Sequence, residues 1–305
     1  MLYGAGAAAA MPALPARAQT TPTIRIGWLP SENAVQPFYA VDQGFLARAG
    51  LNAELTIFAN SQAISNAVAA NAIDVGAADM IQVANGFIHG IPFSFFAGGA
   101  IYSSTAPTLQ LLVAKDAPYK TAKDLEGQSV AVIALNSISA ISLQEWLHVN
   151  GADVSKVKIF EAPFTLMLPG LQRGTFAAAL FAEPFVTSAM PECRVLGKTY
   201  DVVADRFYIL SWFASRPWLK TNPDTAKRFA SAIYETARWA NAHRNESATI
   251  LSGVTKVPVE TIRAMNRASF ATSLDAKLMQ PVLDIAYRYR AIDKPVTAAD
   301  LIQAI

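Results

Sequence analysis

Two segments of this chain, about a hundred residues apart, repeat one pattern. They are AVAANAIDVGAADM (67–80) and LPGLQRGTFAAALFAEPF (168–185). Each predicts the end of an amphipathic helix, a tight turn and a short apolar strand, and each strand stops at an acid, Asp79 or Glu183. A strand that ends in a small-residue loop with a polar tip is typical of a ligand-contacting edge in an open α/β sheet. The repeat therefore predicts two lobes that face one cleft.

Length and composition agree with two lobes. A chain of 305 residues exceeds one typical core. Apolar residues make up 52% and charged residues only 16%, which indicates a well-filled interior and excludes a disordered chain. The formal net charge is only +2 and the sequence has no Lys/Arg cluster, so binding to nucleic acid or to an acidic membrane is not expected.

The residues that usually carry catalysis or hold metals are sparse. Cys193 is the single cysteine, which excludes an intramolecular disulfide and a thiolate metal cage. A catalytic cysteine stays open, but a partly buried thiol is the favoured interpretation. His89, His148 and His243 lie far apart on unrelated predicted elements, and phosphate-loop, dinucleotide and nucleophile-elbow motifs are missing. We therefore expect no catalytic residue, no metal and no cofactor.

The N-terminal segment indicates a compartment. Residues 4–19 are small and apolar and contain Ala16-Arg17-Ala18, the A-x-A form that signal peptidase accepts. Two prolines interrupt the segment, which is too short for a transmembrane helix. We expect 1–18 to be a signal peptide, incomplete because a basic start is missing, and the mature protein to be periplasmic. The alternative is a disordered alanine-rich tail.

Hydrophobic periodicity predicts alternating strands and helices in both parts of the chain. The predicted strands are 23–30, 53–59, 73–78, 91–99, 128–134, 157–163, 176–184 and 206–215, and the predicted helices include 37–51, 61–72, 80–90, 137–151 and 165–174. Crossovers of this length imply parallel strands. Asn222, Pro223 and Asp224 form a helix start, with an asparagine cap and an acid in the first turn.

The predicted elements divide into a discontinuous first lobe and an inserted second lobe. The first lobe comprises 22–112 plus 212–305, and the second comprises 116–207. The segments 112–117 and 206–214 cross between them and are the expected hinges. Closure about a hinge around a ligand is a standard conformational change.

Several segments together resemble a known family. They are 27–55, 61–79, DLEGQSVAVIALNS (124–137), RGTFAAALFAEPF (173–185), 222–251 and LDAKLMQPVLDIAYRYRAI (274–292). These segments are similar to the nitrate/sulfonate/taurine-type solute-binding proteins of ABC importers, and they occur in the same order as in that family. The family also includes binders of thiamine pyrimidine precursors and aromatic acids. The likeness covers nearly all of the mature chain. It implies the type II periplasmic binding protein fold, two α/β lobes joined by two hinge strands, with a ligand in the cleft and an ABC permease in the inner membrane as partner.

Candidate ligand-binding residues follow from the topology, because ligands bind beyond the carboxyl ends of the strands. They are Leu29, Ser31, Glu32, Asn33, Asn60, Ser61, Asp79, Met80, Gly98, Gly99, Asn136, Ser137, Ser139, Phe164, Thr165, Glu183 and Tyr208. Uncapped N–H groups at the helix starts near 61, 80 and 137 are expected to hold a carboxylate or sulfonate without an arginine. For Ser61 and Ser137, ordinary N-capping is an equally weighted alternative.

Glu183 is the sharpest candidate. An acid at the end of an apolar strand, beside Pro184, would be partly desolvated without a partner, and in the resembled family an acidic or polar residue in this loop reaches the ligand. The alternative is a salt bridge across the hinge or a surface carboxylate. Aligning the two repeats places Asp79 opposite Ala182, so the two acids are offset by one residue and alternate faces. We expect Glu183 to contact the ligand, with Asp79 and Glu32 as weaker candidates.

Aromatic residues gather near the same strand ends. They are Trp28, Phe38, Tyr102, Phe164, Phe185, Tyr208 and Trp212. Any single one is more often core than cleft wall, but together they favour a ligand with a flat or apolar body over an inorganic ion.

The sequence thus predicts a monomeric periplasmic binding protein rather than an enzyme. It would capture a small organic solute, such as a sulfonate, an aromatic acid or a pyrimidine-like compound, and present it to the permease by lobe closure. One alternative is an enzyme on the same fold, such as a pyrimidine synthase or a chorismate-type dehydratase. Another is a periplasmic ligand sensor.

Overall fold

The computed structural model describes residues 21–305, so the expected signal peptide at 1–18 lies outside the described residues. Within 21–305 the named strands form three sheets. The first has the order β2-β1-β3-β12-β4. Its strands are β1 (Thr23–Trp28), β2 (Asn52–Ile57), β3 (Val75–Ala78), β4 (Phe93–Gly98) and β12 (Ser211–Ser215). Strands β2 and β3 pair in parallel with β1, as the crossover lengths predict, whereas β12 is antiparallel to β3 and β4.

The second sheet has the order β10-β6-β9-β7-β8. Its strands are β6 (Leu109–Ala114), β7 (Ser129–Val132), β8 (Lys158–Glu161), β9 (Ala178–Ala182) and β10 (Cys193–Gly197). Strands β8 and β9 pair in parallel with β7, and β6 is antiparallel to β9 and β10. The helices of this sheet are α5 (Ile138–Val149), α6 (Phe164–Gln172) and α7 (Phe185–Ala189). We call the body around the first sheet the first lobe, and the body around this sheet the second lobe.

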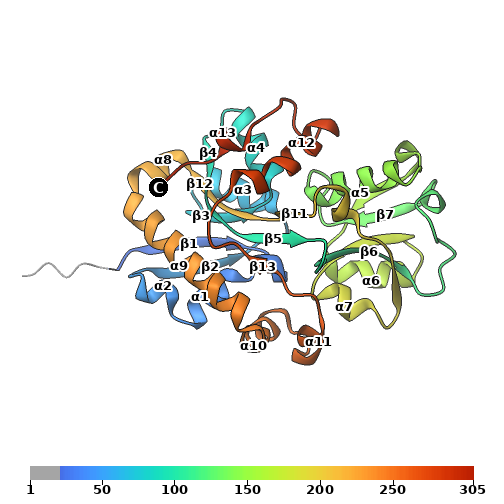
Figure 1. The fold of residues 1–305 in the computed structure, drawn as a ribbon, viewed down its shortest axis with the longest axis horizontal. Helices are drawn as coiled ribbons and strands as arrows, with labels where there is room; N and C mark the ends of the chain where they lie inside the picture. Colours follow the sequence, from blue (N-terminus) through green and yellow to red (C-terminus); the bar gives the residue numbers. More distant parts are fainter. Residues whose placement is uncertain (1–20) are drawn as a thin grey trace, which may run out of the picture.

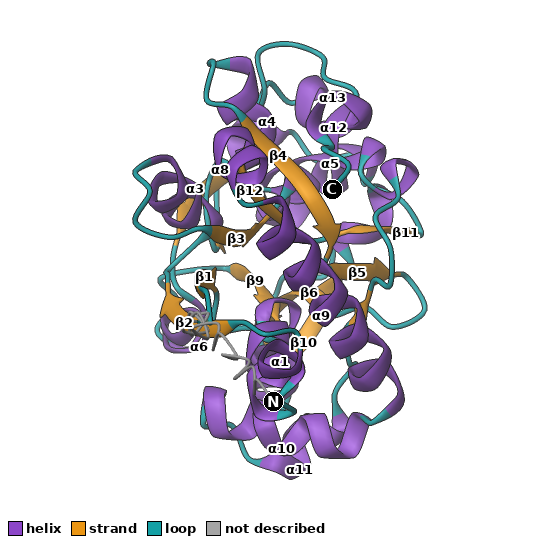
Figure 2. Cartoon of the chain, turned by 90° about the vertical axis from the view of Figure 1, so that its left-hand side faces the viewer, coloured by secondary structure: helices purple, strands orange, loops and turns teal. Residues whose placement is uncertain are grey.

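Helices from both ends of the sequence pack around the first sheet. They are α1 (Gln36–Asp42), α2 (Phe45–Arg48), α3 (Ser61–Ala69), α4 (Met80–Ile88), α8 (Arg216–Thr221), α9 (Pro223–Ala242), α10 (Arg244–Thr255), α11 (Val259–Ala264), α12 (Gln280–Arg288) and α13 (Ala298–Leu301). The first lobe is therefore discontinuous in sequence. Figure 1 shows the lobes side by side along the long axis, with α5, α6 and α7 at one end and α1, α2 and α9 toward the other. In Figure 2, α4 and α13 lie on one side of β1, β2 and β3, with α1, α10 and α11 on the other.

The third sheet lies where the chain passes between the lobes (Figure 1). It has the order β11-β5-β13, with β5 (Ala100–Ser103), β11 (Arg206–Tyr208) and β13 (Ser269–Phe270). The predicted crossing at 112–117 is wrong in position, because 109–114 is already β6 of the second sheet. The first passage between lobes is therefore the segment 104–108. The predicted single strand 206–215 is two strands in two different sheets, and it was mistaken for one because both halves are buried and apolar.

Two local differences have simple causes. Gly44 has a φ of 70°, which divides the predicted helix 37–51 into α1 and α2. Asn222 precedes α9 as predicted but makes no side-chain cap, because its amide donates to the Trp218 carbonyl at the end of α8.

Close packing holds α3 against the first sheet. A Cβ on Gly76 of β3 would lie 2.2 Å from Cγ2 of Ile64 on α3, so only glycine fits at this position. The hydrophobic core joins side chains of both lobes, including Val75 and Phe213 of the first and Val130 and Leu180 of the second. The two lobes are therefore in contact with each other in this structure.

Candidate functional site

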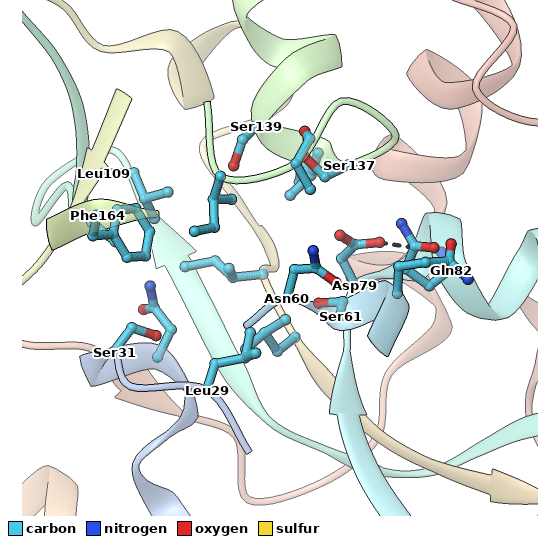
Figure 3. Close-up of a pocket in the computed structure, with 18 of the residues that line it drawn as sticks. Leu29, Ser31, Asn60, Ser61, Asp79, Gln82, Leu109, Ser137, Ser139 and Phe164 are labelled. Carbon is cyan, nitrogen blue, oxygen red and sulfur yellow. Dashed lines mark hydrogen bonds between the residues drawn. The ribbon is translucent and has the colours of Figure 1, made fainter. Parts of the chain in front are cut away.

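A cavity lies between the lobes, at the carboxyl ends of the parallel strands (Figure 3). Its lining comes from both lobes and comprises Leu29, Ser31, Asn33, Asn60, Ser61, Gln62, Asp79, Gln82, Leu109, Ile133, Ala134, Ser137, Ile138, Ser139, Phe164, Ala182, Tyr200, Ile209 and Leu210. The centres of water molecules can occupy about 60 Å³ of it. Because one water needs about 10–15 Å³ on this measure, the cavity has room for several waters or one small organic molecule.

Asp79 is the acid of the cavity. It ends the apolar strand β3 and is the N-cap of α4, where its Oδ1 accepts from the backbone N–H groups of Ile81 (3.1 Å) and Gln82 (3.2 Å). Burial raises the pKa of Asp79 to about 7, although backbone N–H groups, including that of Ile138 at the start of α5, lower it. The starts of two helices, one from each lobe, thus face this one carboxyl group.

Gln82 lies one turn into α4 and also lines the cavity. Its Nε2 donates to the backbone carbonyl of Asn136 in the second lobe. Its Oε1 is buried and has no hydrogen-bond partner among the described residues. A buried acceptor without a partner costs free energy, so this atom is a candidate contact for a ligand donor.

The start of α3 forms the neighbouring wall. Asn60 caps α3 by accepting from the N–H of Ala63 (3.0 Å), and its Nδ2 donates to Glu161 of the second lobe (3.3 Å). Ser61 lies beside it on the cavity surface. The expectation of uncapped helix starts near 61 and 80 is therefore wrong, because Asn60 and Asp79 occupy those N–H groups themselves.

The second lobe contributes hydroxyl groups from the opposite side, as Figure 3 shows for Ser137 and Ser139. The Oγ of Ser139 lies 3.3 Å from the hydroxyl of Tyr200, and both groups are buried. The Oγ of Ser137 donates to the carbonyl of Ala134 (2.6 Å) instead of capping α5. Burial raises the pKa of Tyr200, so its hydroxyl stays neutral and can donate or accept.

The rest of the wall is apolar. Leu29, Leu109, Phe164, Ile209 and Leu210 line it, two of them from the passage between β11 and β12. Within the part of the chain that the structure describes, no lysine, arginine or histidine lines the cavity. Nor do the described residues contain a cluster of three or more potential metal ligands.

Glu183, the sharpest sequence candidate, does not line the cavity. Its carboxylate accepts from the backbone N–H (3.0 Å) and the hydroxyl (2.9 Å) of Thr187 on α7. Burial raises the pKa of Glu183 to about 7, hydrogen bonds from Thr187 lower it, and the nearby charge of Glu32 raises it. Among the described residues Glu183 forms no salt bridge across the hinge. Its carboxylate bonds to its own helix α7, so the expected ligand contact stays a prediction that the cavity lining does not support.

Glu32 is also turned away from the cavity. It is fully buried, and its Oε1 accepts from Nε of Arg267 (2.8 Å) and from the N–H of Ala268 (3.2 Å). Arg267 donates further to Tyr39 and Ser247. This ion pair joins residues more than two hundred positions apart, so the sequence carried no signal for it. It is structural rather than ligand-facing.

Six other candidates are also outside the cavity lining, for several reasons. Gly98 and Gly99 serve close packing, since a Cβ would lie 2.4 Å from the Ser273 carbonyl and 2.5 Å from the Leu210 carbonyl, respectively. The hydroxyl of Tyr208 donates to that same Ser273 carbonyl. The others are Met80, which is core, Asn136, which is exposed and contributes only its carbonyl, and Thr165, which is exposed.

Sequence reasoning also missed part of the lining. The missed residues are Gln62, Gln82, Leu109, Ile133, Ala134, Ile138, Ala182, Tyr200, Ile209 and Leu210. Gln82 was within reach of the topological rule, because it lies one turn beyond a strand end that the rule selected. Tyr200 and Leu210 follow no strand end of the parallel core, so that rule does not select them.

Polar contacts across the lobes surround the site. Glu145 of α5 accepts from Arg288 (2.7 Å) and Tyr289 (2.6 Å), which end α12 and follow it. The N–H of Glu32 donates to the backbone carbonyl of Glu183 (3.2 Å). Together with the contacts of Asn60 and Gln82, these bonds hold the lobes closed around the cavity.

A sequence profile described as NMT1/THI5 like matches residues 32–247, more than half of the chain. The chain belongs to this family. The match covers the cavity-lining residues of both lobes apart from Leu29 and Ser31. It also confirms the family expected from the sequence.

Solved structures share the fold at low sequence identity. The periplasmic aliphatic sulphonate binding protein SsuA from Escherichia coli is 19% identical, with 92% of each chain covered and a TM-score of 0.74. The periplasmic nitrate-binding protein NrtA from Synechocystis PCC 6803 is 15% identical, with 93% of this chain and 85% of that chain covered and a TM-score of 0.79. The desulfurization enzyme DSZB is 14% identical, with 93% of this chain and 96% of that chain covered and a TM-score of 0.70.

These similarities confirm the predicted α/β periplasmic binding protein fold. A search of curated protein sequences finds no significant match. No helix among residues 21–305 has the length and apolar character needed to cross a bilayer. Because the fold is found in both binders and an enzyme, the function has to be argued from the site.

Proposed function

We propose that this protein captures a small organic solute between its two lobes and hands it to an ABC importer. The observation that carries the proposal is the cavity at the carboxyl ends of the strands, lined from both lobes and surrounded by hydrogen bonds that cross between them. A cavity with a mostly apolar wall and a few polar groups is the usual form of a small-molecule site. The solute enters when the lobes separate and is enclosed when they close.

The partner and the compartment belong to the same proposal. Two structural neighbours are periplasmic binding proteins by description, for aliphatic sulphonate and for nitrate. By analogy this chain would be exported by a signal peptide, act as a monomer in the periplasm and present its closed form to an inner-membrane permease. The two lobes would open and close about the connecting segments at 104–108 and near 206–210, which act as the hinge.

A catalytic role is the second candidate, because DSZB has the same fold and is an enzyme. The cavity argues for binding instead. Cys193 is buried in β10, outside the lining, and burial raises the pKa of its thiol, which disfavours the nucleophilic thiolate. The lining offers hydroxyl and amide groups around one carboxyl group, a set suited to recognition.

Thermal unfolding with a library of small organic solutes tests the proposal. A solute present at a hundred times its Kd stabilises the folded state by about 2.7 kcal/mol, so a specific ligand gives a clear rise in Tm. Small-angle scattering with that solute should show a more compact protein. A library without a stabilising solute, or conversion of a bound solute into a product, would overturn the proposal.

A further inference from the structure

We propose that the cavity selects a neutral or positively charged solute that presents N–H donors, and that it rejects sulfonates and carboxylates. The inference rests on the proposed function and narrows its ligand. It departs from the sequence expectation of a sulfonate or aromatic acid. Three features of the lining carry it.

The first feature is the absence of positive charge from the described lining. Arg267, a buried cation of the first lobe, lies outside the lining, and its donors are used by Glu32, Tyr39 and Ser247. Moving an anion from water into a closed cavity is costly unless a cation or several N–H donors replace the water. No side chain of the lining supplies a full positive charge.

The second feature is that the starts of α3 and α4, which would otherwise attract an anion, already carry side-chain caps. Asp79 accepts from the N–H groups of Ile81 and Gln82 at the start of α4, and the N–H of Ile138 at the start of α5 lowers the pKa of Asp79. Asn60 caps α3 in the same way. The protein has thus placed its own carboxyl group where a ligand anion would otherwise bind, and a second anion beside it would be repelled.

The third feature is a pair of buried acceptors on the same helix start. Gln82 is only 3% exposed, its Nε2 is used by the Asn136 carbonyl, and its Oε1 has no partner among the described residues. Asp79, at the N-cap of the same helix, is also 3% exposed and lines the cavity. Two neighbouring acceptors match a ligand with two N–H groups, such as an amidine, an amide or an amine on an apolar body.

The apolar wall determines the size and character of the rest of the ligand, away from its N–H groups. Leu29, Leu109, Phe164, Ile209 and Leu210 leave room for one compact apolar group opposite the acceptors. A ligand with a single ring or a short branched chain fits this description. The hydroxyls of Ser139 and Tyr200 can donate or accept, so they tolerate either neutral or charged nitrogen groups.

Isothermal titration with two matched series of probes tests the selectivity. One series is benzamidine, benzamide, benzoate and benzenesulfonate, and the other carries the same groups on an isopropyl body. Within each series the size is nearly constant while the charge changes. We expect the amidine or the amide to bind and the two anions to bind at least tenfold more weakly.

The Asp79→Asn variant gives a second readout. Asparagine is an equally good N-cap, so α4 is expected to form, but the negative charge is lost. Affinity for the amidine should fall about ten- to hundredfold, since a hydrogen bond to a charged group is stronger than a neutral one. Asp153→Asn is the matched control, because Asp153 is an exposed capping aspartate of the second lobe, outside the cavity lining, and should leave the affinity unchanged.

The pH dependence separates a direct charge contact from a structural effect. Because the pKa of Asp79 in the ligand-free protein is about 7, a cationic ligand must displace a proton below that pH. Affinity for benzamidine should weaken by up to about tenfold per pH unit below 7 and level off above it. Tyr200, the titratable group that faces Asp79, keeps its proton throughout this range because its pKa is raised. In Asp79→Asn the pH profile should be flat.

The outcomes distinguish the two proposals. Binding of benzoate or benzenesulfonate as tightly as the amidine overturns the selectivity and leaves the solute-binding function standing. So does an amidine affinity that is unchanged in Asp79→Asn. If neither the probes nor the solute library stabilises the protein, the proposed function fails and the selectivity fails with it.

Discussion

The loops that follow β3 and β9 have a similar backbone arrangement, but their acidic side chains lie in different surroundings. Each is preceded by a helix and a turn with a left-handed residue, Asn71 at a φ of 55° and Gly174 at 69°. Each strand is buried along its whole length. Yet the acid after β3 lines the cavity, and the acid after β9 packs beneath α7.

The difference arises from a single position of register. Counting from the two turns, Asp79 corresponds to Ala182, and both of these residues line the cavity. Glu183 comes one residue later, in the turn between β9 and α7, and its carboxylate bonds to Thr187 instead of lining the cavity. The repeated backbone thus indicates where the cleft lies, and the side chain at one register position decides its chemistry. The repeat predicts the offset correctly, and the cavity favours Asp79 over Glu183 as the acid that faces a ligand.

Arg267→Met should have the largest effect on the edge that carries Glu183. It leaves the carboxylate of Glu32 fully buried and without its cation, next to Glu183. Removing one partner of a buried ion pair costs about 3–5 kcal/mol. We expect that loss in the free energy of unfolding, measured by urea denaturation at pH 7.

Arg263→Met is the matched control for that substitution. Arg263 pairs with Glu260 on α11, with 41% and 77% of the two side chains exposed. An exposed pair of this kind contributes about 0.5 kcal/mol or less. Equal losses in the two variants would mean that Glu32 needs no buried partner, contrary to the network described above.

Glu183→Gln should produce the next largest effect, and one that depends on pH. The pKa of Glu183 is about 7 in the folded protein against a reference value of 4.5, so the carboxyl group takes up a proton on folding between these values. The contribution of Glu183 to folded-state stability is therefore highest below pH 4.5 and falls as the pH rises through 7. Glutamine cannot ionise and avoids this loss, which amounts to about 2–3 kcal/mol.

Urea denaturation at pH 5 and pH 8 measures this effect. The stability of Glu183→Gln relative to wild type should increase between the two pH values, while its affinity for any cavity ligand stays within twofold. A stability difference that does not change with pH would show that Glu183 is ionised throughout, held by Thr187 alone. A large loss of affinity would place Glu183 back at the ligand.

Much of the fold was predictable because its signals are local. Apolar periodicity located the strands and helices of both parallel cores, and Asn222 to Asp224 marked the start of α9. The crossing points were not predictable to the residue, because β5 and β6, and likewise β11 and β12, are neighbouring buried strands in different sheets. Sheet membership depends on long-range pairing that local pattern does not encode.

The site was predictable as a place and less so as a set of residues. The rule of strand ends selected Leu29, Asn60 and Asp79, which all line the cavity. The rule does not tell which polar side chains already have a hydrogen-bond partner within the protein. The bond between Glu32 and Arg267 spans 235 positions, and only the folded structure shows that this acid is occupied.

The two edges face each other only while the lobes are closed, and Glu145→Gln should loosen that closure slightly. Glutamine keeps the shape and one acceptor but loses the charge that binds Arg288, whose side chain is 63% exposed. A pair that is partly exposed contributes about 0.2–1 kcal/mol, so ligand affinity should fall about two- to fivefold with little change in Tm. Titration calorimetry with a cavity ligand measures the loss, and small-angle scattering should show a larger ligand-free protein.

Glu260→Gln is the control. It also removes a charge from an ion pair, but Glu260 and its partner Arg263 both lie on α11, so the pair does not join the two lobes. A similar loss of affinity in that control would indicate a general charge effect, and an unchanged affinity in Glu145→Gln would mean that the cavity residues close the lobes without help from α12.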